Sequence, residues 1–594
     1  MDNLPSPKTD YVSASDGAGA SPKTPQISST LESLPNEATP YNALETAPRT
    51  PSSPCQFLPS RLQQLLRSWM VLRWRLSRSV FSLPLPFLTS NLDVKLGDLV
   101  LTLPVVAILV IITAIQAKNR DVTGSGTPPS IAMILLFGFA VRNNSVLLVL
   151  TGIPFERALF YHKVFAIVTI ILSALHGLSY LLAWHNDEEV GKGGTAVTGI
   201  VAFGAMLLMF VLSLNVIRRK FFELFVRTHW ILFIVVIGFA VAHGAALALV
   251  GIVPWAIDML FRLVYRTRMY SQGSVLKTKK NEANVNLDAN SNVLSNNSRM
   301  GVIARDQLSV CALPGNITRI SFPRIRKDTG EVFEYEAGQF AFLCIPTISN
   351  LQWHPFTISS SPHEDMVTFH VKALGDWTVK LLSAAPKGAA ISGDAKSPFD
   401  ILVDGPYGSI SVDLENVSTY SHIVLFSGGI GVTPMRSIVN WLHHEVQNFG
   451  RAEIKRVHFV WSVGDREILQ ALTDDSALQE ESAVSSDAYF PHQLSTGSSS
   501  GDTFKSEFYL TRGERDVEAQ VDQRLDSCLR YGSRPNVNAI LRAMGEQAKQ
   551  NGKQRVAVLV CGPEAMVRDV VNSSLTLSKE MLLQFDVHSE RFEF

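Results

Sequence analysis

Long apolar runs dominate residues 97–267 and predict membrane-spanning helices. A hydrocarbon core about 30 Å thick requires about 20 apolar residues in helical conformation. Five runs reach this length, and a sixth is shorter and carries Asp258 and Arg262. The six runs are 99–117, 131–150, 164–184, 196–217, 230–250 and 251–267.

The charges between these runs predict their orientation. Arg157 and Lys163 lie in loop 151–163, and loop 218–220 is Arg-Arg-Lys, whereas loop 185–193 is acidic. The positive-inside rule therefore places the N-terminus, both basic loops and the basic segment after residue 262 in the cytosol. An even number of spans is needed for this arrangement, so the sixth run is retained. Both chain termini are then cytosolic.

The pattern changes after about residue 303 to short alternating or β-branched runs. The runs 307–312, 316–322, 339–345 and 366–373 predict strands of an antiparallel barrel. After residue 420, strands of the type HIVLFSGG, VHFVWSV, EFYLTR and VAVLVCG alternate with helices. This alternation predicts a parallel, doubly wound α/β sheet.

Three polar segments interrupt the pattern. Residues 1–58 are rich in Ser, Thr and Pro and are predicted to be disordered, and a basic stretch with Trp69 and Trp74 follows. That stretch is either a helix on the anionic face of the membrane or an ordinary solvated helix. Segments 276–300 and 472–503 are predicted surface insertions. The predicted domains are 1–96 (tail), 97–267 (membrane), 268–415 (barrel) and 416–594 (α/β).

Composition supports a membrane protein and excludes some functions. Charged residues are only 18% of the chain, which is low for a soluble enzyme. The net charge of zero, from 53 basic and 53 acidic residues, argues against a nucleic-acid partner. Five scattered cysteines without a C-x-x-C pair argue against a disulfide framework or a cysteine-ligated metal. The first residues lack a secretory-signal pattern.

Four histidines in the predicted spans form two pairs of equal spacing. Thirteen residues separate His162 from His176, and thirteen separate His229 from His243. Fourteen helical positions rise about 21 Å and make nearly four turns, so each pair projects from one face at two depths. The topology sets His162 level with His229 near the cytosolic surface and His176 level with His243 near the outer one. Imidazoles facing each other across a bundle suit the axial positions of haem iron.

Two further polar residues belong to the predicted spans. Arg142 lies within the second run and either binds a haem propionate or snorkels towards the cytosol. His185, at the outer end of the third run, is expected at the membrane interface.

Two motifs of the barrel predict a flavin site. His354-Pro355-Phe356-Thr357 follows the Gly338-Gln339-Phe340 strand, and its aromatic and hydroxyl groups suit an isoalloxazine ring. Downstream, the segment from Lys372 through Gly375 to Thr378 offers backbone amides and a hydroxyl for a diphosphate. Asp404-Gly-Pro-Tyr-Gly408 then forms a turn that closes the barrel.

A glycine-rich turn begins the α/β domain. Gly428, Gly429, Gly431 and Thr433 lie at a strand-to-helix junction, where a backbone can approach a pyrophosphate. The motif is not G-x-G-x-x-G, so a structural turn is the alternative.

The end of the α/β domain holds two further candidates. Cys561-Gly562-Pro563 ends the last predicted strand, where the thiol either neighbours the nicotinamide C4 or is an inert buried group. The terminal aromatic segment around Phe592 either covers the flavin or is a frayed tail.

These motifs, in this order over residues 97–594, resemble those of the ferric reductase family, which is related to the NADPH oxidases and, in its soluble half, to ferredoxin–NADP reductases. The resemblance implies a six-span α-helical bundle followed by a cytosolic module with an antiparallel FAD barrel and a doubly wound NADPH domain. It implies two b-type haems, FAD and NADPH as cofactors, and Phe592 rather than Phe594 as the aromatic on the flavin. The residues implied are, for haem, His162, His176, His229 and His243; for FAD, His354, Pro355, Phe356, Thr357, Gly375 and Thr378; for NADPH, Gly428, Gly429, Gly431, Thr433, Cys561 and Gly562.

The sequence departs from the family at the site expected for the 2′-phosphate of NADPH. Relatives often carry an arginine soon after the tryptophan-containing second strand, but here Trp461 leads into Gly464-Asp465-Arg466. Arg466 or Arg534 is the candidate for this phosphate, and NADPH is favoured over NADH.

Two functions compete. A ferric-chelate reductase would deliver electrons to an extracellular Fe(III) chelate or siderophore, or to Cu(II), and an NADPH oxidase would deliver them to O₂. Oxidase-type relatives usually have one residue fewer in the second histidine pair and a long outer loop between spans five and six. Both pairs here are H-x13-H and that loop is minimal, so the reductase at the plasma membrane is favoured.

Overall fold

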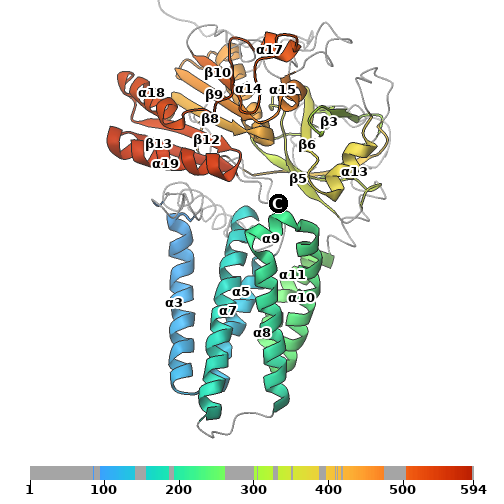
Figure 1. Cartoon of the computed structure of the whole chain (residues 1–594), viewed down its shortest axis with the longest axis vertical. Helices are drawn as coiled ribbons and strands as arrows, with labels where there is room; N and C mark the ends of the chain where they lie inside the picture. The colour runs from blue at the N-terminus through green and yellow to red at the C-terminus, as the bar shows by residue number, and fades with distance from the viewer. Residues whose placement is uncertain are drawn as a thin grey trace, which may run out of the picture. The chain divides into compact units, whose positions relative to one another are not determined.

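The computed structural model describes residues 85, 94–140, 155–185, 193–260, 300–303, 305–325, 332–349, 352–386, 397–408, 410, 412–415, 419–473 and 503–590. Within these ranges the chain forms a helical bundle, two antiparallel sheets and a parallel sheet covered by helices (Figure 1).

Six helices lie side by side in the bundle, one on each predicted apolar run (Figure 1). Helices α3, α7, α8 and α10 are long and apolar enough to cross a membrane. The described parts of α5 and α11 have 12 residues each, so the second and sixth spans remain predictions. The bounds are α3 Leu96–Lys118, α5 Thr127–Gly138, α7 Phe155–His185, α8 Gly193–Ser213, α10 Phe222–His243 and α11 Leu249–Leu260, with the short α4 Val122–Ser125, α9 Asn215–Lys220 and η3 Ala246–Ala248 between them.

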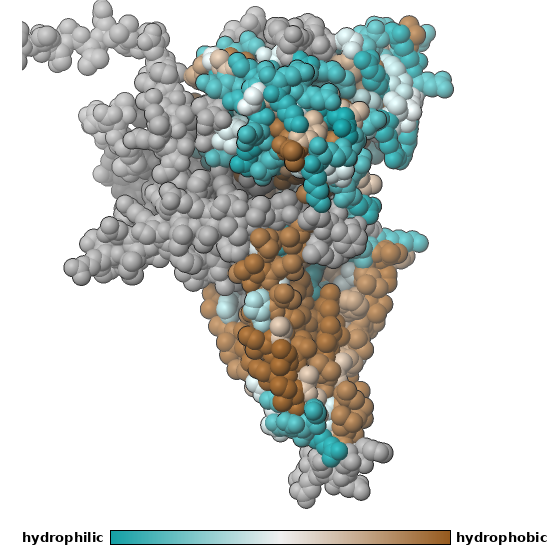
Figure 2. Space-filling view, turned by 90° about the vertical axis from the view of Figure 1, so that its left-hand side faces the viewer, coloured by the Kyte–Doolittle hydropathy of each residue, from teal (hydrophilic) through white to brown (hydrophobic). Residues whose placement is uncertain are grey.

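The outer surface of the bundle is apolar. Ile200 is 70% exposed, Ile234 is 67% exposed and Leu181 is 62% exposed. Figure 2 shows hydrophobic residues covering the visible face of these helices. Such a continuous apolar surface is unfavourable in water and suits lipid tails, because lipid requires only that the backbone polar groups be bonded within the helix. The chain is therefore a membrane protein.

Several predicted boundaries are wrong. Helix α7 begins at Phe155, inside the predicted loop 151–163, and α8 ends at Ser213 rather than near residue 217. The fifth apolar run extends over 230–250, but α10 ends at His243, and Gly244 takes a left-handed conformation with φ 109°. Glycine adopts this conformation without steric cost and ends the helix. The apolar residues continue through η3 into α11, so hydropathy alone could not locate the break.

The barrel domain consists of two antiparallel sheets, with strand orders β1-β7-β4-β5 and β2-β3-β6. The four predicted strands correspond to β2, β3, β4 and β6 within a few residues. Ile320, Leu343, Phe369 and Val403 are fully or almost fully buried in the core between the sheets. The bounds are β1 Met300–Ile303, β2 Ser309–Leu313, β3 Ile317–Pro323, β4 Phe340–Cys344, β5 His354–Thr357, β6 Met366–Lys372 and β7 Ile401–Tyr407, with helix α13 Asp376–Ala384.

The α/β domain contains a six-stranded parallel sheet of order β11-β10-β9-β8-β12-β13, which confirms the predicted doubly wound sheet. The four predicted strands are β8, β9, β10 and β12, and β11 and β13 extend the two edges. His588 and Glu590 belong to β13, so the chain is a strand up to two residues before Phe592. The bounds are β8 His422–Gly428, η5 Gly429–Gly431, α14 Val432–Asn448, β9 Arg456–Val463, α15 Arg466–Thr473, β10 Phe504–Leu510, α17 Gln520–Arg524, β11 Leu529–Tyr531, α18 Val537–Gln550, β12 Arg555–Cys561, α19 Glu564–Met581 and β13 Gln584–Glu590.

Candidate functional site

The bundle brings the four histidines together as the two predicted pairs, between α7 and α10. The ring centroids of His162 and His229 are 6.5 Å apart, and those of His176 and His243 are 5.7 Å apart. The Nε2 atoms of His176 and His243 are separated by 3.4 Å. Imidazole nitrogens lie about 2.0–2.1 Å from a bound metal ion such as zinc, so two of them that bind one ion are at most about 4 Å apart. The outer pair is close to this geometry.

The other ring nitrogen of three of these histidines is held by the protein. His162 Nδ1 lies 3.0 Å from the Leu136 carbonyl oxygen, and His243 Nδ1 lies 2.6 Å from the Thr195 carbonyl oxygen. His176 Nδ1 lies 3.0 Å from Ser125 Oγ, whose own proton goes to the Val122 carbonyl. An Nδ1–H donated to a carbonyl or hydroxyl oxygen leaves the Nε2 lone pair available and fixes the ring orientation, as metal ligands require.

Small residues make room beside the outer pair. A Cβ on Gly199 would lie 2.7 Å from His243 Cε1, and one on Gly126 would lie 3.2 Å from His176 Cε1. Each pair supplies only two protein ligands, fewer than the three or four of protein zinc sites. Haem fits this donor set, because the porphyrin would supply four nitrogens of its own and the protein would need to supply only one or two ligands.

The two flavin motifs meet in the barrel domain. Trp377 at the start of α13 packs against β5, with its ring centroid 4.6 Å from that of His354 and 5.9 Å from that of Phe356. The Trp377 and Phe356 planes differ by only 22°. The sequence did not single out Trp377, although it lies inside the second motif. Its stacking on β5 explains why both motifs form one site.

The hydroxyl groups of Thr357 and Thr378 at this site differ in their hydrogen bonding. Thr357 is 5% exposed, and its Oγ1 has no hydrogen-bond partner among the described residues. A buried hydroxyl left unpaired costs free energy, so a polar atom of FAD is a fitting partner. Thr378 Oγ1, in contrast, accepts hydrogen bonds from the Leu374 and Gly375 amides and donates to the Gly375 carbonyl. It therefore caps α13, and its predicted diphosphate contact is not available in this conformation.

The other predicted residues of the barrel site lie beside these. Lys372 is the last residue of β6, three positions before Gly375, and is half-buried. Pro355 is half-buried in β5 opposite Phe342. Their contacts to a diphosphate or flavin stay predictions.

The glycine turn of the α/β domain is shaped by close backbone packing. A Cβ on Gly428 would lie 3.1 Å from the Gly562 Cα, and one on Gly431 would lie 2.6 Å from the Cys561 carbonyl oxygen. Gly429 has φ 57°, and its carbonyl accepts a hydrogen bond of 2.9 Å from Trp461 Nε1. These glycines let the ends of β8 and β12 touch beneath the N-terminus of α14. The contacts with β9 and β12 thus hold the turn in place. Its amides lie at the carboxyl edge of the sheet, where ligands bind in such folds.

Cys561 lies at this edge but is 1% exposed. Burial, with the Glu590 carboxylate nearby, raises the pKa of its thiol well above the ordinary value. The thiol is therefore protonated and is not a nucleophile. Ser427, beside it on β8, has a buried Oγ without a partner among the described residues, and Thr433 Oγ1 donates to the Ile430 carbonyl within the turn.

The arginines at the carboxyl edge of β9 to β11 have distinct roles. Arg466 Nε and Nη2 donate to both carboxylate oxygens of Asp522 at 2.9 Å, and Nη2 also donates to the Glu514 carbonyl. Asp522 is 1% exposed, so this ion pair holds the segments around Arg466 and Asp522 together. The Nε and Nη2 atoms of Arg466 are already used in this contact. Arg534 is exposed in the loop between β11 and α18.

The sequence did not identify Arg512 as a candidate. It follows the end of β10 and is exposed, and its Nε would lie 3.7 Å from a Cβ on Gly464. Its guanidinium therefore lies beside Gly464, the residue that directly follows the tryptophan-containing strand β9. Only the pairing of β9 with β10 brings these two positions together.

Two predicted site residues, Arg142 and Phe592, lie outside the described residues. The side chain of His185 is also outside the described part of the chain.

Three family models match the chain in sequence order. Residues 126–240 match the ferric reductase like transmembrane component, which covers the helices that carry the histidine pairs except the end of α10. Residues 302–411 match an FAD-binding domain, and residues 420–575 match the ferric reductase NAD binding domain.

Relatives of two kinds are similar to this chain. Respiratory burst oxidase homolog protein D of Arabidopsis thaliana is 26% identical over 509 residues, which cover 74% of this chain and 52% of that protein. Ferric reduction oxidase 7, chloroplastic, of the same plant is 30% identical over 363 residues, covering 58% and 43%. The chain thus spans about half the length of these two. The heavy chain of a superoxide-generating NADPH oxidase from Dictyostelium discoideum is 28% identical over 413 residues, covering 66% and 69%.

Among solved structures, the chain is similar to a ferredoxin NADP+ reductase from Neisseria gonorrhoeae with bound FAD and NADP. The match has a TM-score of 0.32 and 15% identity, and covers 49% of this chain and 99% of that one.

The order of the three domains and both kinds of relative agree with the motifs. The chain carries, in this order, a ferric reductase like transmembrane component, an FAD-binding domain and a ferric reductase NAD binding domain, and it is similar to a ferric reduction oxidase and to NADPH oxidases.

Proposed function

We propose that this protein is an NADPH-dependent ferric-chelate reductase that passes electrons across the plasma membrane and supports iron uptake. In this proposal bound FAD would supply the conversion of a hydride equivalent from NADPH into single electrons. The two histidine pairs would hold two b-type haems, which would supply one-electron transfer towards an extracellular Fe(III) chelate or siderophore, or Cu(II). The observation that carries the transmembrane relay is the pair of facing imidazoles, His176 and His243, with Nδ1 of each tied to oxygen.

Each part of the path has its own residues. His162 and His229 would hold the inner haem, and His176 and His243 the outer one. Phe356, Thr357 and Trp377 would contact the flavin, and the turn Gly429–Gly431 at the N-terminus of α14 would receive the pyrophosphate of NADPH. Lipid contacts the apolar outside of the bundle, and both chain termini are cytosolic in this proposal.

The preference for NADPH is assigned to Arg512 together with Arg534. Arg512 lies at the carboxyl edge of the sheet beside Gly464, while Arg466 is occupied by Asp522. A guanidinium on this edge can accept the 2′-phosphate that distinguishes NADPH from NADH.

The choice of a chelate as the acceptor is supported by the connection between α10 and α11. Only residues 244–248, with no charged side chain among them, join these helices. His243 is the last residue of α10, directly before this connection. A connection this short cannot fold over the adjacent histidine pair, which favours access by an acceptor as bulky as a metal chelate.

The second candidate is an NADPH oxidase that reduces O₂ to superoxide. The names of several relatives favour it, since respiratory burst and superoxide-generating oxidases match up to 74% of this chain. Oxygen needs no wide access to a haem, so the short connection between α10 and α11 does not exclude this reaction.

One assay on whole cells separates the two functions. Cells expressing the full chain are tested for reduction of chelated Fe(III) and for release of superoxide, with His176→Ala as the control. Fe(III) reduction that persists when superoxide is scavenged, and that His176→Ala abolishes, supports the reductase. Superoxide release without direct Fe(III) reduction would reverse the assignment.

A further inference from the structure

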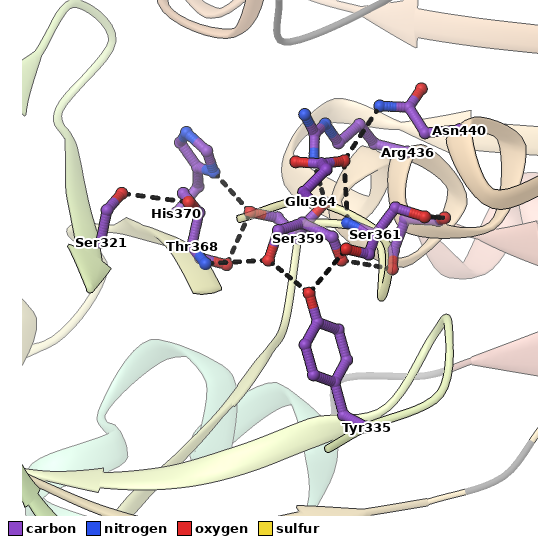
Figure 3. A network of polar contacts seen from close by, with 11 residues as sticks. Ser321, Tyr335, Ser359, Ser361, Glu364, Thr368, His370, Arg436 and Asn440 are labelled. Atoms are coloured by element: carbon purple, nitrogen blue, oxygen red, sulfur yellow. Dashed lines mark hydrogen bonds and ion pairs between the residues drawn. The ribbon is translucent and has the colours of Figure 1, made fainter. Parts of the chain in front are cut away.

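A buried ion pair connects the barrel domain to the α/β domain. Arg436 Nη1 in α14 donates to both carboxylate oxygens of Glu364 at 2.8 Å and to the Ser359 carbonyl at 2.8 Å. The side chains of Arg436 and Glu364 are 3% and 10% exposed. Figure 3 shows the guanidinium and the carboxylate close together beside Asn440, within a polar network that continues through Ser359 and Ser361.

Serine residues extend this contact on both sides. Ser361 Oγ donates to the Ser437 carbonyl at 3.0 Å, and Ser437 Oγ donates to the Ser360 carbonyl at 2.6 Å. Tyr335 Oη lies 2.8 Å from Ser360 Oγ and donates to the Ser361 carbonyl (Figure 3). The segment 359–364 is thereby bonded to its own barrel and to α14 at once.

Glu364 is also fully oriented by its neighbours. The Ser361 amide donates to its Oε1 at 2.9 Å, and Asn440 Nδ2 donates to the same atom at 3.4 Å. A buried ion pair contributes little net stability compared with well-packed apolar side chains, because both charges lose their hydration. Such a pair instead fixes the relative orientation of the two segments that carry it, because each hydrogen bond accepts only a narrow range of distances and angles.

The pair connects the two elements between which hydride must pass. Segment 359–364 begins two residues after Thr357, the last residue of the flavin strand β5. Arg436 lies one helical turn after Val432, where α14 leaves the glycine turn. A helical turn rises about 5.4 Å, so Arg436 lies close to the glycine turn. A shift of the Arg436–Glu364 contact would therefore displace the glycine turn relative to β5 by about the same distance as the shift itself.

We propose that Glu364 and Arg436 are positioning residues that set the distance between the nicotinamide and the flavin. The inference rests on the proposed use of NADPH and FAD by the two domains. In the reaction concerned, the nicotinamide C4–H bond breaks and hydride moves to FAD, which leaves NADP⁺ and a reduced flavin holding both electrons. Displacement by about 1 Å can slow such a step about 100-fold without loss of binding.

The test compares flavin reduction by NADPH in the full-length protein and in Glu364→Gln, followed anaerobically by the loss of flavin absorbance. Glu364→Gln keeps the shape and some hydrogen bonds but removes the charge. We expect the rate at saturating NADPH to fall by at least about 10-fold, while the NADPH concentration for half-maximal rate and the FAD content change by less than about 3-fold. Arg436→Lys, which keeps the charge but replaces the planar guanidinium by an ammonium group, is expected to retain an intermediate rate.

Asp586→Asn is the matched control. Asp586 pairs with Arg555 at 2.8 Å, but both residues belong to the α/β domain. Loss of the Asp586 charge should leave the rate of flavin reduction within about 2-fold of that of the unmodified protein.

Three outcomes overturn the inference. They are an unchanged rate of flavin reduction in Glu364→Gln, an equal fall of this rate in Asp586→Asn, or a fall of the rate in Glu364→Gln that a lower FAD content fully explains. If Glu364→Gln does not accumulate, Arg436→Lys decides the question, and a rate equal to that of the unmodified protein refutes the role. Failure of the unmodified protein to reduce its flavin with NADPH would instead refute the proposed function itself.

Discussion

His176 Nε2 and His243 Nε2 face each other at 3.4 Å, although 66 residues of sequence lie between the two histidines. Each ring is anchored through Nδ1, His176 to Ser125 Oγ and His243 to the Thr195 carbonyl. A pair held in this way presents two lone pairs to one point between α7 and α10.

The first prediction concerns haem content. His176→Ala removes one ligand of the outer pair and should lower the b-type haem absorbance per protein by about half, since the inner pair stays intact. His162→Ala should remove the other half. Dithionite-reduced difference spectra of membranes, normalised to protein, measure both. A full haem complement in both variants, or no b-type spectrum in the unmodified protein, would refute ligation by these residues.

The second prediction concerns cofactor preference. Arg512→Ala should raise the KM for NADPH by about 10–100-fold, because a charge-assisted hydrogen bond contributes about 1.5–3 kcal/mol. The KM for NADH should change by less than about 2-fold, since NADH has no 2′-phosphate. Steady-state rates with both dinucleotides give this comparison.

Arg515→Ala is the control for charge alone, because Arg515 is also exposed but pairs with Asp526 at 2.7 Å. An equal effect of Arg512→Ala on NADPH and NADH would contradict the assignment to the 2′-phosphate.

The third prediction uses the unpaired hydroxyl of Thr357. Thr357→Val removes a buried hydroxyl that has no partner among the described residues, so the protein without FAD should be as stable as before or more stable. FAD binding should weaken by up to about 10-fold if this hydroxyl bonds the flavin. Thermal unfolding with and without added FAD, together with FAD titration, measures the two effects.

Ser359→Ala is the contrasting variant. Ser359 Oγ donates to the Thr368 carbonyl and lies 2.8 Å from His370 Nδ1, so its loss should destabilise the protein whether or not FAD is bound. The assignment of Thr357 fails if Thr357→Val lowers stability without FAD and leaves FAD affinity unchanged.

The fourth prediction concerns pH. His363 stacks on His444 with ring centroids 3.9 Å apart, and burial, then the nearby His444, Arg436, His443 and Arg324, lower the pKa of His363 to about 3. The unfolded chain, with the ordinary pKa of 6.5, binds a proton in this range that the folded protein does not. Stability from this group is therefore complete above pH 6.5 and is lost as the pH falls towards 3.

His363→Phe keeps a stacked ring but cannot titrate, so its unfolding temperature should fall less between pH 7.5 and pH 5 than that of the unmodified protein. Unfolding followed by flavin fluorescence at both pH values provides the measurement. Only the difference between the two proteins is assigned to His363, because His370 and His422 also have lowered pKa values. Parallel pH dependence in both proteins would exclude this contribution.

Much of the fold was predictable because its determinants are local. Apolar length located the four long helices, and alternation located β2, β3, β4 and β6, since both patterns depend only on neighbouring residues. The equal H-x13-H spacing also predicted the pairing of His162 with His229 and of His176 with His243. The break at Gly244 was not predictable in this way, because an apolar run continues through it.

The sequence by itself determined the long helices, most of the central strands and the chemistry that each motif offers. Tertiary structure alone decided three relationships: Arg512 lies beside Gly464, Arg466 is occupied by Asp522, and Glu364 pairs with Arg436 across two domains. Each depends on side chains that come from different elements and meet only after the sheets and helices pack. A sequence pattern fixes the direction in which a residue points along its own strand or helix, whereas its partner depends on the register and packing of another element.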